Sequence, residues 1–325
     1  MFRSHFFAAT TAVSIALLPQ ASAAADQVKM LFDWIPGGIH SAWYAGAKNG
    51  CFADLDLEFS FDRGSGSVDT VAKVAAGLGD IGMADFGTMM LGVSNNGAKV
   101  KALTPIYSDA PFGIMTVAST GIGSVSDLEG KKLASGPGDA GILMLPLAMD
   151  LAGSDFSKVE SEKADFSALL GLLLQGKIDG HTTFLTTSKI LSAVVSNAGK
   201  TPQFVHFGES LDMYGSVLIA NEQFLAERPD VARRAMEATQ CALKAAPTDP
   251  EAAVDALLEL FPEKKRESEL AAIGGGIELI FDSSAHAENG FNWDETRVRT
   301  THSNTMKAQG QAAEFGSMSD YIHNF

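Results

Sequence analysis

Hydrophobic and polar positions in the first hundred residues switch between the period of a strand and that of a helix. Apolar residues occupy alternate positions at 55–61 (LDLEFSF), which predicts a half-buried strand. At 68–78 they recur at helical spacing, which predicts an amphipathic helix. Short apolar runs that begin at Leu31 and Ile81 are typical of buried strands. The resulting β-α-β-α-β order favours a parallel sheet covered by helices.

A second β/α set follows further along the chain. We expect strands at 112–118, 132–135 and 204–208, and a helix at 166–174. One more strand is expected near 213–220, after which the pattern is mostly helical to the end of the chain. A helical tail of this kind cannot easily fold alone, so we expect it to pack against the first unit.

These patterns predict an α/β fold with two lobes, each a mostly parallel sheet flanked by helices. Lobe 1 would comprise residues 26–110 and 213–325, and lobe 2 residues 111–212. The chain would cross between the lobes near 109–113 and 209–215, which makes a two-stranded hinge. Ligands of open α/β sheets lie beyond the carboxyl ends of the strands, so two facing lobes predict a cleft that closes on a ligand.

The N-terminus has the pattern of a secretory signal peptide. Arg3 and His5 precede an apolar run at 6–18, and the small residues Ala21-Ser22-Ala23 follow. We therefore expect residues 1–23 to be removed and the protein to be exported to the periplasm. No lipobox cysteine follows the signal, so we expect a free periplasmic protein.

The charge balance excludes one class of partner. The chain has 24 Lys and Arg against 39 Asp and Glu, a net charge of −15. Binding to nucleic acid or to anionic membrane requires clustered cations. The longest basic run is Lys264-Lys265-Arg266. We therefore expect no nucleic-acid partner.

The cysteines and glycine motifs predict no cofactor and no metal site. Cys51 and Cys241 leave two alternatives open, a disulfide bond in an oxidising compartment or two separate buried thiols. The seven histidines are scattered and show no zinc spacing. Residues 136–141 match G-x-G-x-x-G, but Pro137 interrupts the motif and export argues against a dinucleotide.

Candidate ligand-binding residues follow the predicted strands, at the edge where a cleft would open. Several precede helix starts, whose N–H groups bind anions and neutral acceptors. The alternative is ordinary α/β turn chemistry with aromatic side chains in the core. The candidates are Asp33, Trp34, His40, Trp43, Tyr44, Gly64, Ser65, Ser67, Asp85, Phe86, Ser135, Gly136, Gly138, Asp139, Thr183, Phe184, Asp212 and Tyr214.

The chemistry of these loops favours a flat, neutral or weakly basic heterocycle. They contain several carboxylates and only Arg63 as a flanking cation, which would serve a multiply charged anion poorly. Their aromatic rings offer stacking faces. His40 has two alternative roles, a hydrogen bond to the ligand or an ordinary helix contact, and a role as an acid or base is a further hypothesis. No G-x-S-x-G nucleophile motif is present.

Motifs spread over residues 28–260 resemble the NMT1/THI5-like group of periplasmic solute-binding proteins. The motifs are Leu31 to Pro36 with His40 and Tyr44-Ala45, Lys48 to Phe52, Gly64-Ser65-Gly66, Val74 to Gly77 with Asp80-Ile81-Gly82, Leu128 to Lys132, and Leu218 to Leu225 with Pro229. The resemblance implies a type II periplasmic-binding fold and a receptor of an ABC importer, with a small-molecule ligand and a membrane permease as partners. Members serve thiamine-precursor pyrimidines, riboflavin-like compounds, nitrate, taurine or alkanesulfonates.

The D-W-x-P…H stretch is most similar to the pyrimidine-binding branch, which implies binding roles for Asp33, Trp34, His40 and Tyr44. The chain departs from that branch at 37–43 and at Cys51. Enzymes of the family carry a cysteine-rich motif that this chain lacks, so the resemblance implies a binding protein and no catalytic residues. We expect a monomer. The alternatives are a receptor for an aliphatic sulfonate, taurine or nitrate-like anion, and a pyrimidine-related enzyme that uses His40.

Overall fold

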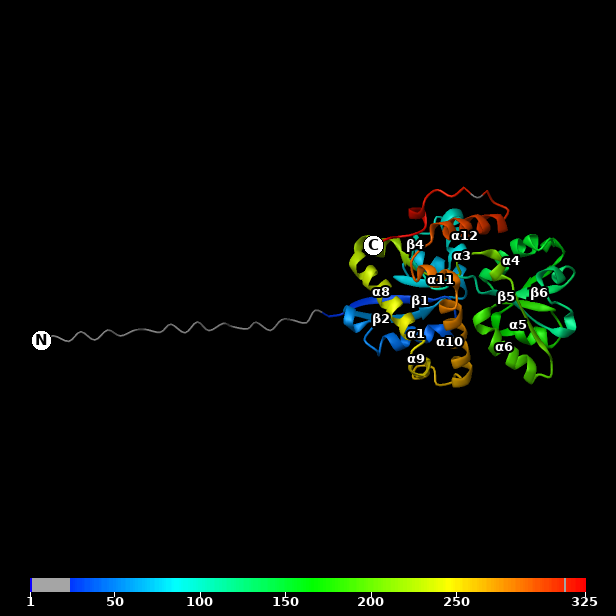
Figure 1. The fold of residues 1–325 in the computed structure, drawn as a ribbon, viewed down its shortest axis with the longest axis horizontal. Helices are drawn as coiled ribbons and strands as arrows, with labels where there is room; N and C mark the ends of the chain where they lie inside the picture. Colours follow the sequence, from blue (N-terminus) through cyan, green and yellow to red (C-terminus); the bar gives the residue numbers. More distant parts are fainter. Residues whose placement is uncertain (2–23, 313) are drawn as a thin grey trace.

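The computed structural model describes residue 1, residues 24–312 and residues 314–325. The predicted signal peptide therefore lies almost wholly outside the described residues. Within them the chain forms two sheets of five strands each, which lie side by side with helices on their faces (Figure 1). The predicted α/β class is confirmed.

The first sheet has the order β2-β1-β3-β10-β4. Neighbouring strands β1, β2 and β3 are parallel, whereas β10 runs antiparallel to both of its neighbours. β10 is the strand that returns from the second sheet, so its direction is reversed. The strands are β1 (Asp26–Phe32), β2 (Leu57–Arg63), β3 (Ile81–Asp85), β4 (Val100–Pro105) and β10 (Ser216–Asn221).

The second sheet repeats this plan with the order β7-β6-β8-β5-β9. Its antiparallel strand is β5, which is the first strand after the chain crosses over. The short edge strand β7 was not predicted from the sequence. The strands are β5 (Phe112–Val117), β6 (Lys132–Ser135), β7 (Glu160–Lys163), β8 (Gly180–Phe184) and β9 (Pro202–His206).

Helices cover both sheets, and the last third of the chain packs on the first sheet as predicted. With the first sheet lie α1 (Ser41–Gly46), α2 (Ser67–Ala75), α3 (Phe86–Asn96), α7 (Glu222–Glu227), α8 (Pro229–Ala245), α9 (Pro250–Leu258), α10 (Arg266–Phe281), α11 (Ser284–Asn289) and α12 (Glu295–Ala308). With the second lie α4 (Ala140–Leu151), α5 (Phe166–Leu174) and α6 (Leu185–Asn197). Short 3₁₀ turns are η1 (Gly38–His40), η2 (Ala53–Leu55), η3 (Ala118–Thr120), η4 (Val125–Leu128), η5 (Phe156–Lys158), η6 (Gly208–Leu211) and η7 (Met318–Asp320).

The alternation along β1 explains how one strand serves two cores. Met30 and Phe32 belong to a buried cluster with residues of α1, α8, α9 and α10. Leu31 points to the opposite face and joins a cluster with residues of α2, α3 and α12. Successive side chains of a strand point to opposite faces, so a strand buried on both sides is apolar throughout.

The second of these clusters also continues across the boundary between the two units. It includes Met144 of α4 together with Met89 of α3 and Met306 of α12. On the other side of the boundary, α10 packs against α6 (Figure 1). The two units are therefore in contact on both sides of the space between the sheets. We retain the lobe boundaries 26–110, 111–212 and 213–325 as a proposal.

The two crossing segments pack backbone to backbone. A Cβ atom on Gly208 would lie 2.0 Å from the carbonyl oxygen of Ala110, so this approach requires glycine. Arg297 of α12 binds both crossings, with Nη2 2.6 Å from Asp109 and Nη1 2.6 Å from Asp212. Its guanidinium also lies over the ring of Tyr214. One side chain therefore ties both segments of the predicted hinge to α12.

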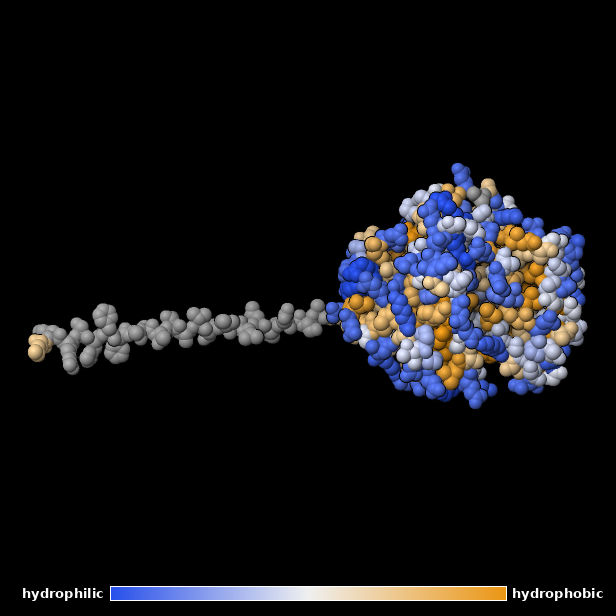
Figure 2. Space-filling view, viewed as in Figure 1, coloured by the Kyte–Doolittle hydropathy of each residue, from blue (hydrophilic) through white to orange (hydrophobic). Residues whose placement is uncertain are grey.

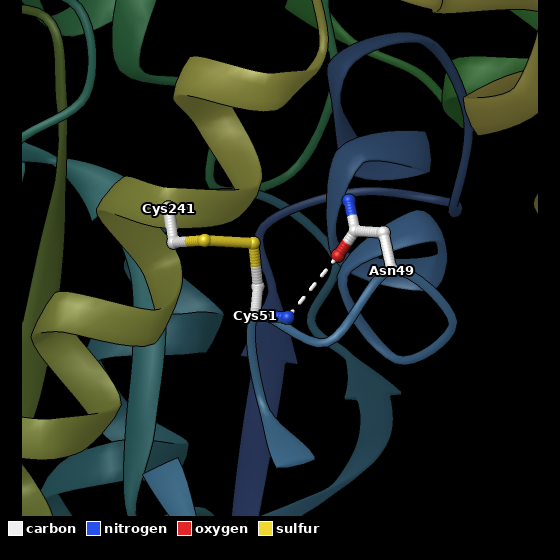
Figure 3. Close-up of a disulfide and its surroundings, with 3 residues drawn as sticks. All are labelled: Asn49, Cys51 and Cys241. Atoms are coloured by element: carbon white, nitrogen blue, oxygen red, sulfur yellow. Dashed lines mark hydrogen bonds between the residues drawn. A yellow bond between two sulfur atoms is a disulfide. The ribbon is translucent and has the colours of Figure 1, made fainter. Parts of the chain in front are cut away.

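Cys51 and Cys241 form a disulfide bond, which decides between the two alternatives that the sequence leaves open. Figure 3 shows the bond between the segment after α1 and the helix α8. Asn49 accepts a hydrogen bond from the backbone N–H of Cys51 at 3.2 Å. The bond closes over 190 residues of sequence and therefore joins the N-terminal part of the first unit to its C-terminal helices.

The surface of the molecule is mixed in hydropathy (Figure 2). Hydrophilic side chains are spread over both units on the face shown in Figure 2, with apolar patches between them. Among the described residues, no helix has both the length and the apolar run that crossing a membrane would require.

Candidate functional site

A cavity of about 390 Å³ lies between the two units. The first unit lines it with residues that follow β1 and β4 and with residues of α10, and the second lines it with the N-terminus of α4, with α5 and with the junction of β8 and α6. This is the position where open α/β sheets bind ligands, and the volume suits a small organic molecule. Seven of the predicted residues line it: Asp33, Trp34, His40, Ser67, Asp139, Thr183 and Phe184.

Most of the cavity wall is apolar. The contributing side chains come from both units, with Tyr107 and Phe166 among the rings and leucines on α5 and α6. An apolar wall with a few polar groups binds a ligand by its faces and orients it by its edges. The apolar and aromatic residues are Trp34, Ile35, Ile39, Met83, Tyr107, Phe166, Leu169, Leu170, Phe184, Ile190 and Leu191.

Asp33 and His40 form a buried polar pair on one wall. Asp33 follows the last residue of β1 and is 6% exposed. Nε2 of His40 lies 3.3 Å from its Oδ1, a contact that the imidazole N–H would donate. The ring of His40 stacks on Phe32 with 4.5 Å between centroids, which fixes its orientation. Nδ1 of His40 is buried and has no partner among the described residues.

Asp85 lies behind this wall. It ends β3 and caps α3, where Oδ1 accepts a hydrogen bond from the N–H of Thr88 at 2.7 Å. Its own N–H donates to Oγ of Ser67, a residue of the cavity wall. Burial, together with the neighbouring carboxylates Asp33 and Asp139, raises the pKa of Asp85 to about 7, against the hydrogen bond from Thr88. Asp85 was predicted as a ligand residue, but it does not line the cavity and acts on it only from behind.

Asp139 occupies the opposite wall, on the second unit. Its Oδ1 accepts hydrogen bonds from the N–H groups of Gly141 and Ile142 and so caps α4. Its Oδ2 accepts from Oγ1 of Thr182 at 2.8 Å. Burial raises the pKa of Asp139, and these hydrogen bonds oppose the rise. The N-terminus of α4 is therefore occupied by a carboxylate of the protein itself.

His181 precedes Thr182, the hydrogen-bond partner of Asp139, on β8 and lines the same cavity. Its Nδ1 lies 3.0 Å from the carbonyl oxygen of Thr182. A carbonyl oxygen only accepts, so Nδ1 must carry the proton. Burial lowers the pKa of His181, which favours the neutral ring. Nε2 is then a lone-pair acceptor, and it is buried without a partner among the described residues.

Trp34 meets an aromatic residue of the other unit. The ring of Phe166, at the start of α5, lies edge-on to Trp34 with 4.0 Å between centroids. Phe166 in turn covers the backbone of Gly136, where a Cβ atom would lie 2.1 Å from the ring. The predicted residue Gly136 therefore packs under the ring of Phe166, where a side chain would not fit. The two units also approach closely at Gly66, where an added Cβ atom would lie 2.6 Å from the carbonyl oxygen of Gly138.

We expect Gly136→Ala to weaken ligand binding about tenfold, because the new methyl group displaces the ring of Phe166 from Trp34. Isothermal titration calorimetry with the ligand that copurifies measures the change. Gly171→Ala on α5 is the matched control, because its Cβ atom would meet only Gln175 at 3.9 Å. Equal affinities of the two variants would contradict the role given to Phe166.

Lys264 and Glu269 complete the lining and were missed from the sequence. Oε2 of Glu269 accepts from the N–H of Gly38 at 2.8 Å, and Oε1 lies 3.1 Å from Nζ of Lys264. The expectation that Arg63 is the nearby cation is wrong, because the cation that lines the cavity is Lys264. Its charge is already paired with Glu269. Both residues lie in the helical C-terminal part of the chain, and nothing in its sequence indicated that it would reach the cleft.

Trp43 and Tyr44 do not line the cavity, contrary to the prediction. Trp43 is fully buried in the core of the first unit. Tyr44 packs on Phe61 and Phe261 in the same core, and burial raises its pKa to about 12. The helix α1 turns its aromatic side chains toward β1 and α9, so the alternative of core aromatics is correct for this pair.

The other predicted residues also lie away from the cavity lining. Phe86 packs on Trp293 and Tyr214, and Ser135 is buried at the end of β6. Asp212 and Tyr214 contact Arg297 at the crossing segments. The loop residues outside the lining are Gly64, Ser65, Gly136 and Gly138. These residues were predicted because they follow strands, but only the packing of the chain decides which strand ends face the cleft.

Most of the chain is similar in sequence to known proteins. Residues 39–253 match a family model described as NMT1/THI5 like. A protein of Brucella abortus named as a binding protein is 25% identical over 209 residues, which is 63% of this chain. The match spans 62% of that relative's length. The riboflavin-binding protein RibY of Chloroflexus aurantiacus is 22% identical over 75% of this chain and 69% of its own.

Solved structures show the same fold at low identity. The alkanesulfonate-binding protein SsuA of Xanthomonas axonopodis has a TM-score of 0.62 at 12% identity, over 78% of this chain and 85% of its own. A Candida albicans protein described as having the generic periplasmic binding protein fold has a TM-score of 0.67 at 13% identity, over 92% of this chain and 96% of its own. At such identities these likenesses establish the fold alone.

Proposed function

Because the chain belongs to the NMT1/THI5-like family, we propose that it is the substrate-binding component of an ABC importer and works in the periplasm. It captures a small, flat heteroaromatic molecule between its two units and delivers it unchanged to a membrane permease. The single observation that carries this proposal is the cavity, whose apolar walls from both units surround a few buried hydrogen-bond acceptors.

The acceptors determine which ligand edges fit. Asp33, His40 and His181 present a carboxylate and two ring nitrogens, and both of those nitrogens lack a partner among the described residues. A buried acceptor without a partner is costly, so the ligand should supply N–H donors. Amino groups on a planar ring meet this requirement, and Trp34 supports the ring face. An aminopyrimidine of the thiamine-precursor type combines both features.

Anions are less suited to this cavity, because carboxylates of the protein already occupy several of the backbone N–H groups around it. Asp85 caps α3, Asp139 caps α4, and Glu269 takes the N–H of Gly38. Helix N-termini that are already capped by a carboxylate repel a second anion. The cation Lys264 is paired with Glu269.

A receptor for an aliphatic sulfonate or nitrate-like anion is the second candidate. One observation favours it: no side chain caps the N-terminus of α2, where Ser67 lines the cavity. The structural neighbour from Xanthomonas binds an alkanesulfonate, as its description states. The N-termini of α5 and α6, where Phe166 and Phe184 line the cavity, also lack a side-chain cap. Lys264, a cation of the lining, is already paired with Glu269, so we rank this candidate below the heterocycle.

Native mass spectrometry of protein purified from its source tests the proposal. We expect a copurified heteroaromatic compound whose mass is unchanged after incubation with the protein. Thermal shift assays with aminopyrimidines, riboflavin, taurine and nitrate follow, because a ligand that binds only the folded state raises the melting temperature. A shift with taurine or nitrate alone would favour the second candidate, and a new product mass would indicate an enzyme that uses His40.

We expect Trp34→Ala to weaken binding of the heteroaromatic ligand at least about tenfold, because an aromatic stacking face of this kind contributes about 1–1.5 kcal/mol or more. Trp34→Phe is the control and should retain most of the affinity. Titration calorimetry measures both variants. A small anion would lose little affinity in either variant, so an unchanged dissociation constant in Trp34→Ala would contradict the stacking role.

A further inference from the structure

Two buried carboxylates line the cavity, one from each unit, and a third lies behind the wall of the first unit. Asp33 comes from the end of β1, Asp85 from the end of β3, and Asp139 from the start of α4. Among the described residues, no Lys or Arg forms an ion pair with any of the three, and only His40 contacts Asp33. Other carboxylates near the cavity are compensated, as the pairing of Glu269 with Lys264 shows. The cavity therefore has a deficit of positive charge.

We propose that the ligand carries a protonated amino group, whose positive charge lies among Asp33, Asp139 and, behind them, Asp85. This inference rests on the proposed function and names the charge of the ligand. Burying a carboxylate without a counter-charge is unfavourable, and several such groups in one place are more so. An ammonium group of the ligand removes this penalty and adds charge-assisted hydrogen bonds.

Unpartnered atoms support the same conclusion independently of the charges. Oδ2 of Asp85, Nδ1 of His40 and Nε2 of His181 are all buried and accept no hydrogen bond from the described residues. His40 and His181 line the cavity, and both are more than nine-tenths buried. An ammonium group has three donors and no acceptor, so it matches acceptors of this kind.

A metal ion does not fit this deficit. No group of three His, Cys, Asp or Glu side chains among the described residues is placed to hold a metal ion. The carboxylates also already accept hydrogen bonds, Asp139 from three donors and Asp85 from one. The positive charge is therefore expected on an organic molecule that fills the apolar part of the cavity as well.

The titratable groups around Asp85 all act in one direction. Asp33 and Asp139 face it and raise its pKa, together with its own burial. Tyr107 lines the cavity beside Asp33, and that carboxylate and burial raise its pKa too. Its hydrogen-bond and strand partners are uncharged: Ser67 on α2, Thr88 on α3 and Ser216 on β10. Because Asp139 belongs to the other unit, a ligand cation also links the two units electrostatically.

A matched pair of probes tests the inference at pH 7. The first probe is 4-amino-5-aminomethyl-2-methylpyrimidine, whose aminomethyl group is largely protonated, and the second is the neutral 5-hydroxymethyl analogue. The rings are the same, so stacking is held constant. Titration calorimetry of the full exported chain should give about tenfold or more tighter binding for the aminomethyl probe, the effect of one charge-assisted hydrogen bond in a buried site.

Asp85→Asn identifies the source of the preference. Asn retains a cap oxygen for the N–H of Thr88 but removes the charge. The preference for the aminomethyl probe should fall several-fold in this variant. Asp249→Asn is the control, because Asp249 caps α9 in the same way and is exposed. If Asp85→Asn does not fold, Asp33→Asn and the two probes on the unmodified protein still decide the matter.

The outcomes separate this inference from the proposed function. Equal or tighter binding of the hydroxymethyl probe would overturn the inference and leave a heterocycle receptor intact. Binding of neither probe, with a thermal shift from taurine or nitrate, would overturn both. A preference for the aminomethyl probe that survives in both Asp85→Asn and Asp33→Asn would also overturn the assignment of the charge to these carboxylates.

Discussion

Replacing both Cys51 and Cys241 with serine is expected to lower the free energy of unfolding by about 3–5 kcal/mol. The disulfide spans 190 residues of sequence, so its loss frees a large loop in the unfolded chain. Chain-entropy estimates place loops of this size at the upper end of the usual range. Denaturant unfolding monitored by circular dichroism measures the change.

Two further measurements separate the loss of the disulfide from other effects of the substitutions. Reduction of the unmodified protein should lower its stability by the same amount as the double substitution. A serine at Cys51 alone leaves Cys241 free and should match the double variant. The entropic account would be wrong if the reduced protein kept the stability of the oxidised one, since both share the same folded contacts around Cys51 in the core of the first unit.

Asp85→Asn is expected to remove a component of the pH dependence of stability worth about 3 kcal/mol between pH 5 and pH 8. Burial and two neighbouring carboxylates raise the pKa of Asp85 from its ordinary value of 3.8 to about 7 in the folded protein. Asn does not titrate, so the variant gains stability relative to the unmodified protein as the pH rises.

The sign follows from proton binding. Below about pH 4 Asp85 is protonated in both the folded and the unfolded chain, and its contribution to stability is complete. Between about pH 4 and pH 7 the unfolded chain releases the proton first, so stability falls as the pH rises. Above about pH 7 the folded protein holds an ionised, buried carboxylate and the loss is complete.

Thermal and urea unfolding at pH 5, 6, 7 and 8 measure this difference. Asp249→Asn again provides the control, because that cap is exposed and its stability difference should stay constant over the range. Parallel pH profiles of Asp85→Asn and the unmodified protein would contradict the raised pKa. Added ligand should flatten the profile of the unmodified protein, since a bound cation favours the ionised carboxylate.

Local patterns along the chain pointed to some of the residues that line the cavity. Asp33 and Trp34 come directly after an apolar strand, and Asp139 comes directly before a helix. Both positions lie at the carboxyl ends of strands, and in a two-unit α/β fold those ends face the space between the sheets. The patterns failed for Trp43 and Tyr44, because an aromatic residue on a short helix has the same spacing whether it faces a ligand or a core.

The sequence by itself determined the α/β class, most of the strands and helices in their order, and the family. These depend on periodicity, turn residues and motifs that are local in the chain. Only the tertiary structure decided the disulfide partner, the contact of Phe166 with Trp34, and the entry of Lys264 and Glu269 into the cavity. Each of these contacts joins residues that are more than 100 positions apart in the sequence or that belong to opposite units. Only the packing of the folded chain brings such residues together.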